Sequence, residues 1–97
     1  MGHTAQIAQV FVGRKPSAVY LAKVITVLAD RDEVLIVARG RFVLKAISVA
    51  VRAAKATGCD CQVAISEEAL RTDGERLVPK IEIRLVKKAV GDRAPGA

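Results

Sequence analysis

The sequence predicts an α/β two-layer sandwich with the element order β-α-β-α-β-β, in which both helices cover one face of a mixed sheet. Residues 34–38 form a continuous apolar run rich in β-branched side chains, which is typical of a strand covered on both faces. Helix-like segments stand before and after this run, as in a βαβ crossover. Residues 61–65 and 81–85 are strand-like, and the Asp73-Gly74 turn signal between them predicts a long hairpin.

The first two elements follow from an apolar run and a proline. Residues 7–12 read as a buried strand that ends at Gly13. Pro16 can open a helix over 17–29, because the first helical turn does not use the N–H that proline lacks.

The second helix follows the central strand and sets the remaining boundaries. Gly40 interrupts the strand pattern, a helix is predicted over 41–57, and Gly58 stands where a helix commonly ends on a left-handed residue. A chain of 97 residues forms one domain. We expect this domain over 7–90, with a flexible lead at 1–6 and a flexible tail at 91–97.

Both predicted helices are apolar on more sides than one sheet can cover. A second copy of the chain, related by a two-fold axis, is the expected cover, and a monomer with an apolar surface is the alternative. The two apolar faces of the first helix are Ala18, Leu21, Ala22, Ile25, Leu28 and Ala29 on one side, and Tyr20, Val24 and Val27 on the other. Those of the second are Val43, Ile47, Ala50 and Ala54, and Phe42, Ala46, Val49, Ala53 and Ala56.

The charge is basic and unevenly placed. The net charge is +6, and the pI of about 9.8 favours a polyanionic partner, with solubility as the alternative reason for the charge. Residues 1–58 hold nine Lys or Arg and three acids, whereas residues 59–97 hold seven of each. The excess therefore belongs to the first part of the chain, which predicts a local basic patch.

Several classes of site are not expected. No apolar run approaches the ~20 residues of a membrane span and no signal-peptide pattern stands at the N-terminus, so a cytoplasmic protein without membrane contact is predicted. Cys59 and Cys61 are too few for a metal site and are interpreted as small packing residues, with a disulfide between subunits as the alternative. We expect no cofactor and no enzymatic activity, because His3 lies in the lead and Glu67 and Glu68 point to opposite faces of a strand.

The polar positions of the second helix fall on one stripe. Their spacing is 4, 3, 4, 3, and none of them is acidic, whereas a solvated helix face usually alternates signs. The stripe comprises Arg41, Lys45, Ser48, Arg52 and Lys55.

Two strand-to-helix turns add further cations. Arg14 and Lys15 lie in the first turn, and Arg39 and Arg41 flank Gly40 in the second. Both turns of a βαβ unit open on one edge of the sheet, beside helix N-termini that favour phosphate oxygens. The pattern predicts an acid-free cluster that neutralises backbone phosphates without reading bases.

These turns also carry a family resemblance. The Gly13-Arg14-Lys15-Pro16 helix opening, followed by residues 38–41 (Ala-Arg-Gly-Arg) at the second helix, resembles the Alba family of archaeal DNA- and RNA-binding chromatin proteins. The resemblance runs from about residue 7 to 88 and includes the element order. It implies a cytoplasmic, chromosome-associated homodimer, or a heterodimer with a related chain, that coats and condenses double-stranded DNA without sequence preference and also binds RNA.

The resemblance also implies which residues make contact. The central body would use Arg14, Lys15, Arg39, Arg41 and Lys45, and the hairpin, with Arg71 and Arg76, would reach along the minor groove.

Three departures from the family pattern stand in this chain. Arg14 stands where the family commonly has a lysine that can be acetylated, and Thr57-Gly58 stands where many members carry an aromatic that joins neighbouring dimers. The hairpin carries four acids against two arginines, so its arms are less cationic than the family pattern implies. The acids are Glu67, Glu68, Asp73 and Glu75.

Two other functions fit the same residues. A subunit of a ribonucleoprotein could use the same patch on A-form RNA backbones. An assembly module of another class would use the apolar helices to recruit a different protein, and would show no salt-dependent binding of nucleic acid.

Overall fold

The computed structural model describes residues 7–70 and 76–88. Its elements are β1 (Ala8–Phe11), α1 (Ser17–Asp30), β2 (Glu33–Arg39), a 3₁₀ turn (Gly40–Phe42), α2 (Val43–Thr57), β3 (Asp60–Leu70) and β4 (Arg76–Val86). The predicted lead at 1–6 and tail at 91–97 lie outside the described residues.

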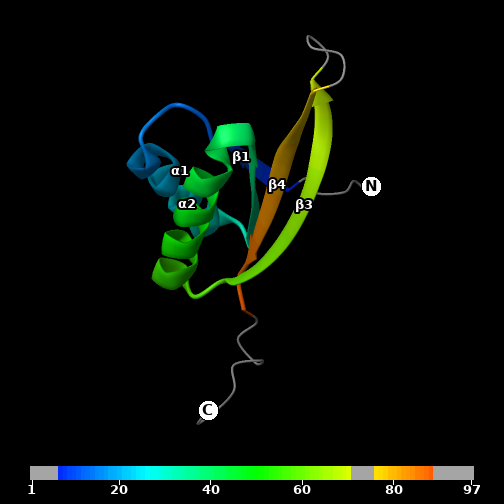
Figure 1. Ribbon diagram of the computed structural model, residues 1–97. Coiled ribbons are helices and arrows are strands. Elements are labelled where there is room, and N and C mark those ends of the chain that lie inside the picture. Colours follow the sequence, from blue (N-terminus) through cyan, green and yellow to red (C-terminus); the bar gives the residue numbers. More distant parts are fainter. Residues whose placement is uncertain (1–6, 71–75, 89–97) are drawn as a thin grey trace, which may run out of the picture.

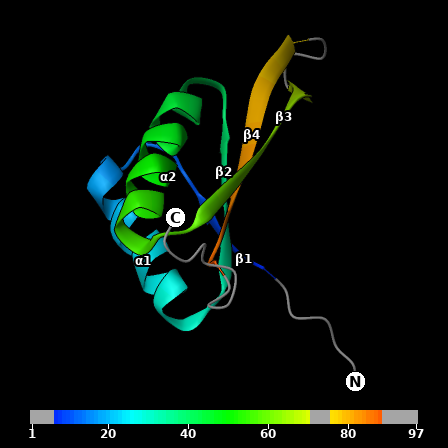
Figure 2. The ribbon, with the colours of Figure 1, turned by 90° about the horizontal axis from the view of Figure 1, so that it is seen from below.

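The sheet has four strands in the order β1-β2-β4-β3. Strands β1 and β2 are parallel, and the β2–β4 and β3–β4 pairs are antiparallel. Both helices cover one face of this sheet, and the other face carries no helix (Figures 1 and 2). The predicted α/β two-layer sandwich with a mixed sheet is confirmed.

The core lies between the helices and the two central strands. Val34, Ile36 and Ala38 of β2 stand opposite Leu85, Ile83 and Ile81 of β4, and all six side chains are buried. Paired residues share a face, so alternate positions of both strands point at the helices. The buried helix residues are Tyr20, Val24 and Leu28 of α1 and Ala46, Val49, Ala50 and Ala53 of α2.

The division of each helix into two apolar faces needs correction. Leu28 belongs with Tyr20 and Val24, because a spacing of four places all three on the face toward the sheet. Leu21 is only partly buried beside them. In α2, Ala50 joins the other buried residues, and Ile47 is exposed instead.

Two glycines with positive φ bound the second helix. Gly58 (φ +76°) ends α2 as predicted, and its N–H donates to the Ala54 carbonyl at 2.7 Å. Gly40 (φ +59°) turns the chain out of β2. The first turn after it is 3₁₀, so α2 begins at Val43 rather than at residue 41. The left-handed backbone at Gly40 leads into the tighter turn, which apolar spacing does not reveal.

The hairpin strands are longer than the apolar runs that predicted them. Pairing extends from Asp60↔Val86 to Leu70↔Arg76, although the sequence indicated only 61–65 and 81–85. Backbone pairing continues through polar residues because alternate side chains face solvent. The Asp73-Gly74 turn lies outside the described residues.

The end of the hairpin projects beyond the rest of the sheet. The last pair between β2 and β4 is Arg39↔Lys80. We call the portion beyond it, residues 67–70 and 76–79, the arm (Figure 1). Pro79 is tolerated there because β4 has become an edge strand and one side of its backbone needs no N–H donor.

The two cysteines have different environments. Cys59 is buried just before β3 and accepts a hydrogen bond from the Thr57 hydroxyl at 3.2 Å. Cys61 lies on β3 and is exposed. Both are free thiols, so the interpretation as packing residues is right for Cys59 and wrong for Cys61 within one subunit.

Candidate nucleic-acid interface

Lys45 fixes the first basic turn onto α2. Its Nζ donates to the carbonyl oxygens of Gly13 at 2.7 Å and Lys15 at 2.9 Å. The side chain is half-buried and has two of its three donors on backbone. Lys45 was predicted as a contact residue, and the structure gives it a second role that the sequence did not indicate: it positions the turn that carries Arg14 and Lys15.

The buried side chain of Tyr20 also holds this turn. Its phenol oxygen accepts the Lys15 N–H at 3.0 Å, and a Cβ added at Gly13 would stand 3.5 Å from that oxygen. Burial alone raises the pKa of Tyr20, but the N–H groups of Lys15 and Gly13 and the charges of Lys45 and Lys15 together bring it below its ordinary value. Hydrogen-bond donors and positive charges therefore surround the phenol oxygen, and such surroundings favour an anion.

Aromatic rings join this turn to the beginning of the second helix. Lys45 Nζ lies 5.9 Å from the ring centre of Tyr20 and 5.6 Å from that of Phe42. The Arg41 guanidinium lies over the ring of Phe42, 5.0 Å from the ring centre. Such distances are those of cation–π contacts.

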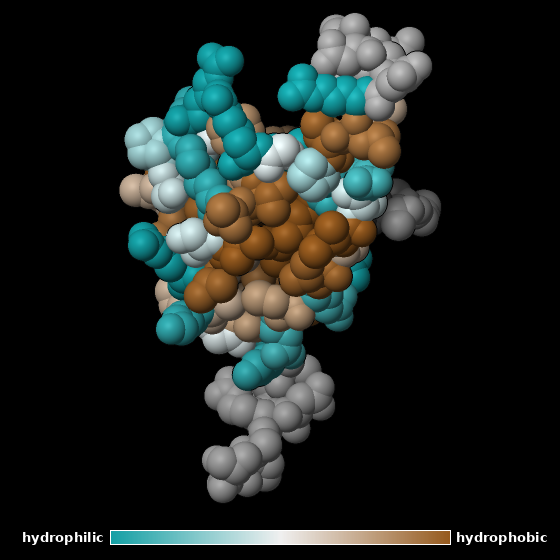
Figure 3. Space-filling model, viewed as in Figure 1, coloured by the Kyte–Doolittle hydropathy of each residue, from teal (hydrophilic) through white to brown (hydrophobic). Residues whose placement is uncertain are grey.

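We call Arg14, Lys15, Arg41 and Lys45 the body cluster. The body cluster lies at the end of the molecule toward which the arm projects. The loop after β1 and the start of α2 stand side by side at this end, with the arm across from them (Figure 1). Arg14, Lys15 and Arg41 are exposed. Hydrophilic side chains dominate this end in the space-filling view (Figure 3). Cations from two segments far apart in sequence therefore share one surface, as the two strand-to-helix turns predicted.

Arg39 departs from the predicted cluster. It stands opposite Lys80 in β4, on the sheet face that the helices do not cover. Arg41, by contrast, lies in the 3₁₀ turn that leads into α2. Its Nε donates to Glu68 Oε1 at 2.5 Å and its Nη2 to Glu68 Oε2 at 3.3 Å. The expectation of an acid-free cluster is therefore wrong at Arg39, because the folded hairpin brings Glu68 onto it.

Glu68 belongs to a row of ion pairs on the open face of the sheet. Lys80 Nζ lies 3.2 Å from Glu68 Oε2 and 3.7 Å from Glu82 Oε2, and Arg84 pairs with Glu33 at 3.3 Å. Hydrogen bonds from Arg39 and Lys80 lower the pKa of Glu68 to about 2. Glu68 is therefore ionised throughout the neutral range.

The remaining predicted residues lie on the arm and on the helix stripe. Arg76 begins β4 opposite Leu70 and is exposed, whereas Arg71 lies outside the described residues. On α2, Arg52 and Lys55 are exposed along the stripe that begins at Arg41. The structure thus groups the body cations, places Arg39 with the arm and leaves Arg52 and Lys55 farther along the helix.

An apolar surface that sequence reasoning largely missed lies between α2 and the hairpin. Leu44, Ile47 and Val51 form an exposed stripe along α2, and Val63 and Ile65 are exposed on β3. Val63 and Ile65 stand opposite Ile83 and Ile81, so they face the helix side of the sheet where no helix covers β3. Hydrophobic side chains form one continuous area here (Figure 3). The spacing of Leu44, Ile47 and Val51 was the available signal.

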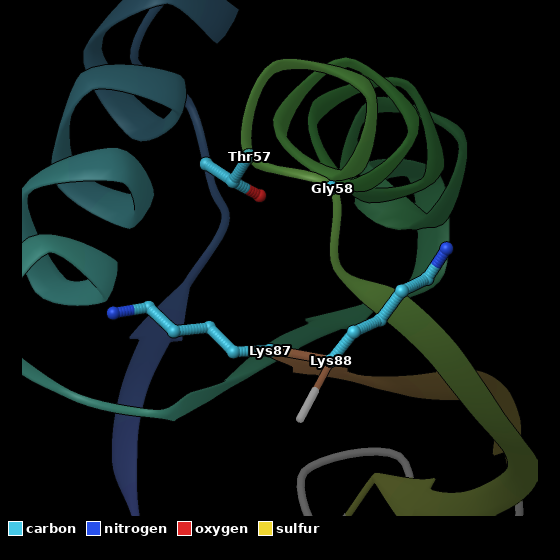
Figure 4. A pocket seen from close by; sticks show the side chains of 4 residues that line it. All are labelled: Thr57, Gly58, Lys87 and Lys88. Carbon is cyan, nitrogen blue, oxygen red and sulfur yellow. The ribbon is translucent and has the colours of Figure 1, made fainter. Parts of the chain in front are cut away.

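A hollow at the opposite end of α2 does not form a focused site. It has a volume of about 410 Å³ and is lined by Thr57, Gly58, Lys87 and Lys88. The two lysine side chains point away from each other (Figure 4). Lys88 also lies 3.9 Å from the Asp60 carboxylate. Because the cations diverge, they offer no common position for one anion.

Within residues 7–70 and 76–88, no group of three His, Cys, Asp or Glu side chains could hold a metal ion. No helix in the same residues combines the length and the apolar character needed to cross a bilayer.

Solved structures with the same fold show what this chain is similar to. Alba from Thermoplasma volcanium matches with a TM-score of 0.72 and 28% identity, over 81% of this chain and 99% of that one. The structure of ALBA1 from Trypanosoma brucei matches with a TM-score of 0.72 and 23% identity, over 91% of this chain and 75% of that one. No family model and no curated protein sequence matches. The chain has an Alba-like fold.

Proposed function

We propose that this protein is a chromatin architecture protein that binds double-stranded DNA through backbone phosphates, without sequence preference, and also binds RNA. The observation that carries the proposal is the body cluster. Its exposed cations Arg14, Lys15 and Arg41, held together by half-buried Lys45, share one end of an Alba-like fold with the arm. Cations fixed on a rigid frame neutralise phosphates and release counterions without any contact to base edges.

The active species in this proposal is a homodimer that associates with the chromosome in the cytoplasm. The apolar surface of Leu44, Ile47, Val51, Val63 and Ile65 supports a second copy as its cover, because exposed apolar areas of this kind mark association sites. A dimer doubles the body cluster from four cations to eight. It also offers two arms, which we expect to follow the minor groove.

A titration with three ligands at several salt concentrations tests the proposal. We expect duplex DNA of unrelated sequences to bind alike, with structured RNA also bound. If a dimer neutralises about 6–10 phosphates, affinity should fall by roughly 10³–10⁵ between about 50 and 200 mM salt. Stronger binding of structured RNA than of duplex would favour a ribonucleoprotein subunit. Salt-independent or absent binding would favour an assembly module and contradict the proposal.

A comparison of double variants tests which surface holds the nucleic acid. We expect Lys15→Ala with Arg41→Ala to weaken all sequences alike and to lower the salt slope by about 0.9 per lost phosphate contact. Arg71→Ala with Arg76→Ala should cost less, since the hairpin has four acids against these two arginines.

The matched control removes two charges at the other end of the molecule. Lys87→Ala with Lys88→Ala changes the net charge equally, and both lysines lie by the hollow at the end of α2 (Figure 4). All variants are checked for folding and for dimer formation first. If the hairpin variant loses the most affinity, the arms hold the nucleic acid and the ranking above is wrong.

A further inference from the structure

Resting on the proposed function, we propose that Glu68 is an internal competitor for phosphate, which occupies Arg39 and Lys80 and thereby limits how tightly the protein binds nucleic acid. Nothing in the sequence pairs residue 68 with residue 39, which are 29 positions apart. The folded hairpin brings them together.

The geometry of the pair is that of a guanidinium holding a phosphate-like group. Two nitrogens of Arg39 donate to the two carboxylate oxygens of Glu68, at 2.5 Å and 3.3 Å. Carboxylates and phosphates bind the guanidinium fork in the same two-point manner. A nucleic-acid phosphate that approaches Arg39 therefore meets donors already occupied by an anion of the protein itself.

The position of Glu68 lets one carboxylate engage two cations. Lys80 stands directly opposite Arg39 and also opposite Ser66, two residues before Glu68 on the same face of β3. The Glu68 carboxylate thus lies over both, with Lys80 Nζ at 3.2 Å from its Oε2. One glutamate offsets cations from two strands at the base of the arm.

The pair remains open to exchange. The side chains of Arg39 and Glu68 are 42% and 39% exposed, so water and a phosphate can reach both groups. The low pKa of Glu68 keeps the carboxylate charged near neutral pH, so protonation does not release it from Arg39. Binding at Arg39 then requires that a phosphate displace an anion, which makes each contact there weaker than one at exposed Lys15 or Arg41.

The test measures duplex DNA affinity of the full chain and of Glu68→Gln at about 50 and 200 mM salt. Glutamine keeps the size of the side chain and removes the charge. We expect tighter binding and a steeper salt slope. One added phosphate contact should make the gain about 3.5-fold larger at the lower salt than at the higher, and two contacts in a dimer about 12-fold larger.

Glu67→Gln is the matched control. It changes the net charge by the same amount at the neighbouring position, but Glu67 stands opposite Pro79 on the other face of the arm. We expect Glu67→Gln to change the affinity much less. Equal effects of the two variants would show that only total charge matters and would overturn the proposal.

Two further results separate the possible failures. In an Arg39→Gln background the gain from Glu68→Gln should shrink, and an undiminished gain would mean that Arg39 is not the cation being held. Weaker binding or loss of folding in Glu68→Gln would show that the carboxylate positions the arm, which also overturns the proposal. A parent protein that binds no duplex at the lower salt would instead contradict the proposed function.

Discussion

Removing Leu44 tests whether the apolar surface between α2 and the hairpin joins two subunits. Leu44 is 77% exposed in the single chain. Burying a leucine fully is worth about 1.5–3 kcal/mol, so covering this one would contribute about 1.2–2.3 kcal/mol, and about 2.3–4.6 kcal/mol in a symmetric dimer with two copies. At about 1.4 kcal/mol per factor of ten, that corresponds to a roughly 50-fold to 2,000-fold change in the dimer dissociation constant. Leu44→Ala keeps Cβ, so the lower part of this range is expected.

Sedimentation equilibrium over a range of concentrations measures that constant. The parent chain should show an apparent mass of about twice 10.3 kDa at micromolar concentration. The Leu44→Ala dimer should dissociate into monomers at higher protein concentrations than the parent dimer. Phe11→Ala is the control, because Phe11 is 59% exposed but lies on the sheet face away from the helices. A monomeric parent, or a dimer weakened by Phe11→Ala and not by Leu44→Ala, would refute the reasoning.

Three further measurements test the support of the body cluster and the end of α2. Lys45→Met should lower the free energy of unfolding by about 1–3 kcal/mol in urea, since it removes hydrogen bonds to the carbonyls of Gly13 and Lys15, whereas exposed Lys23→Met should change it little. Gly58→Ala should cost about 1–2 kcal/mol by the same measurement, because φ is +76° although there is room for a Cβ; an unchanged midpoint would contradict this. Tyr20 is the single tyrosine, so absorbance of the phenolate reports it alone: the midpoint should lie below 10, and Lys45→Met should raise it by removing a nearby positive charge. A midpoint at or above 10 in the parent would count against the donor-rich surroundings described for Tyr20.

Local patterns were sufficient for the elements and for most of the body cluster. Pro16 and Gly58 marked the start of α1 and the left-handed end of α2, because such boundaries depend on neighbouring residues alone, whereas the start of α2 at Val43 was not predicted. Arg14, Lys15 and Arg41 stand in strand-to-helix turns that the βαβ order brings to one end. The two-layer fold followed from the same order.

Pairings between distant residues were decided only by the tertiary structure. The hairpin register brings Glu68 onto Arg39 and Lys80, and no local pattern relates a strand end to a position 29 residues later. The tie from Lys45 to the Gly13 carbonyl spans 32 residues and likewise depends on how α2 packs beside the first turn. The exposure of Val63 and Ile65 arises because two helices cannot cover a four-stranded sheet to its β3 edge. The sequence by itself thus determined which cations and apolar residues are present and on which elements they lie. Packing decided which of these charges are accessible to a phosphate, because ion pairing depends on distances in space.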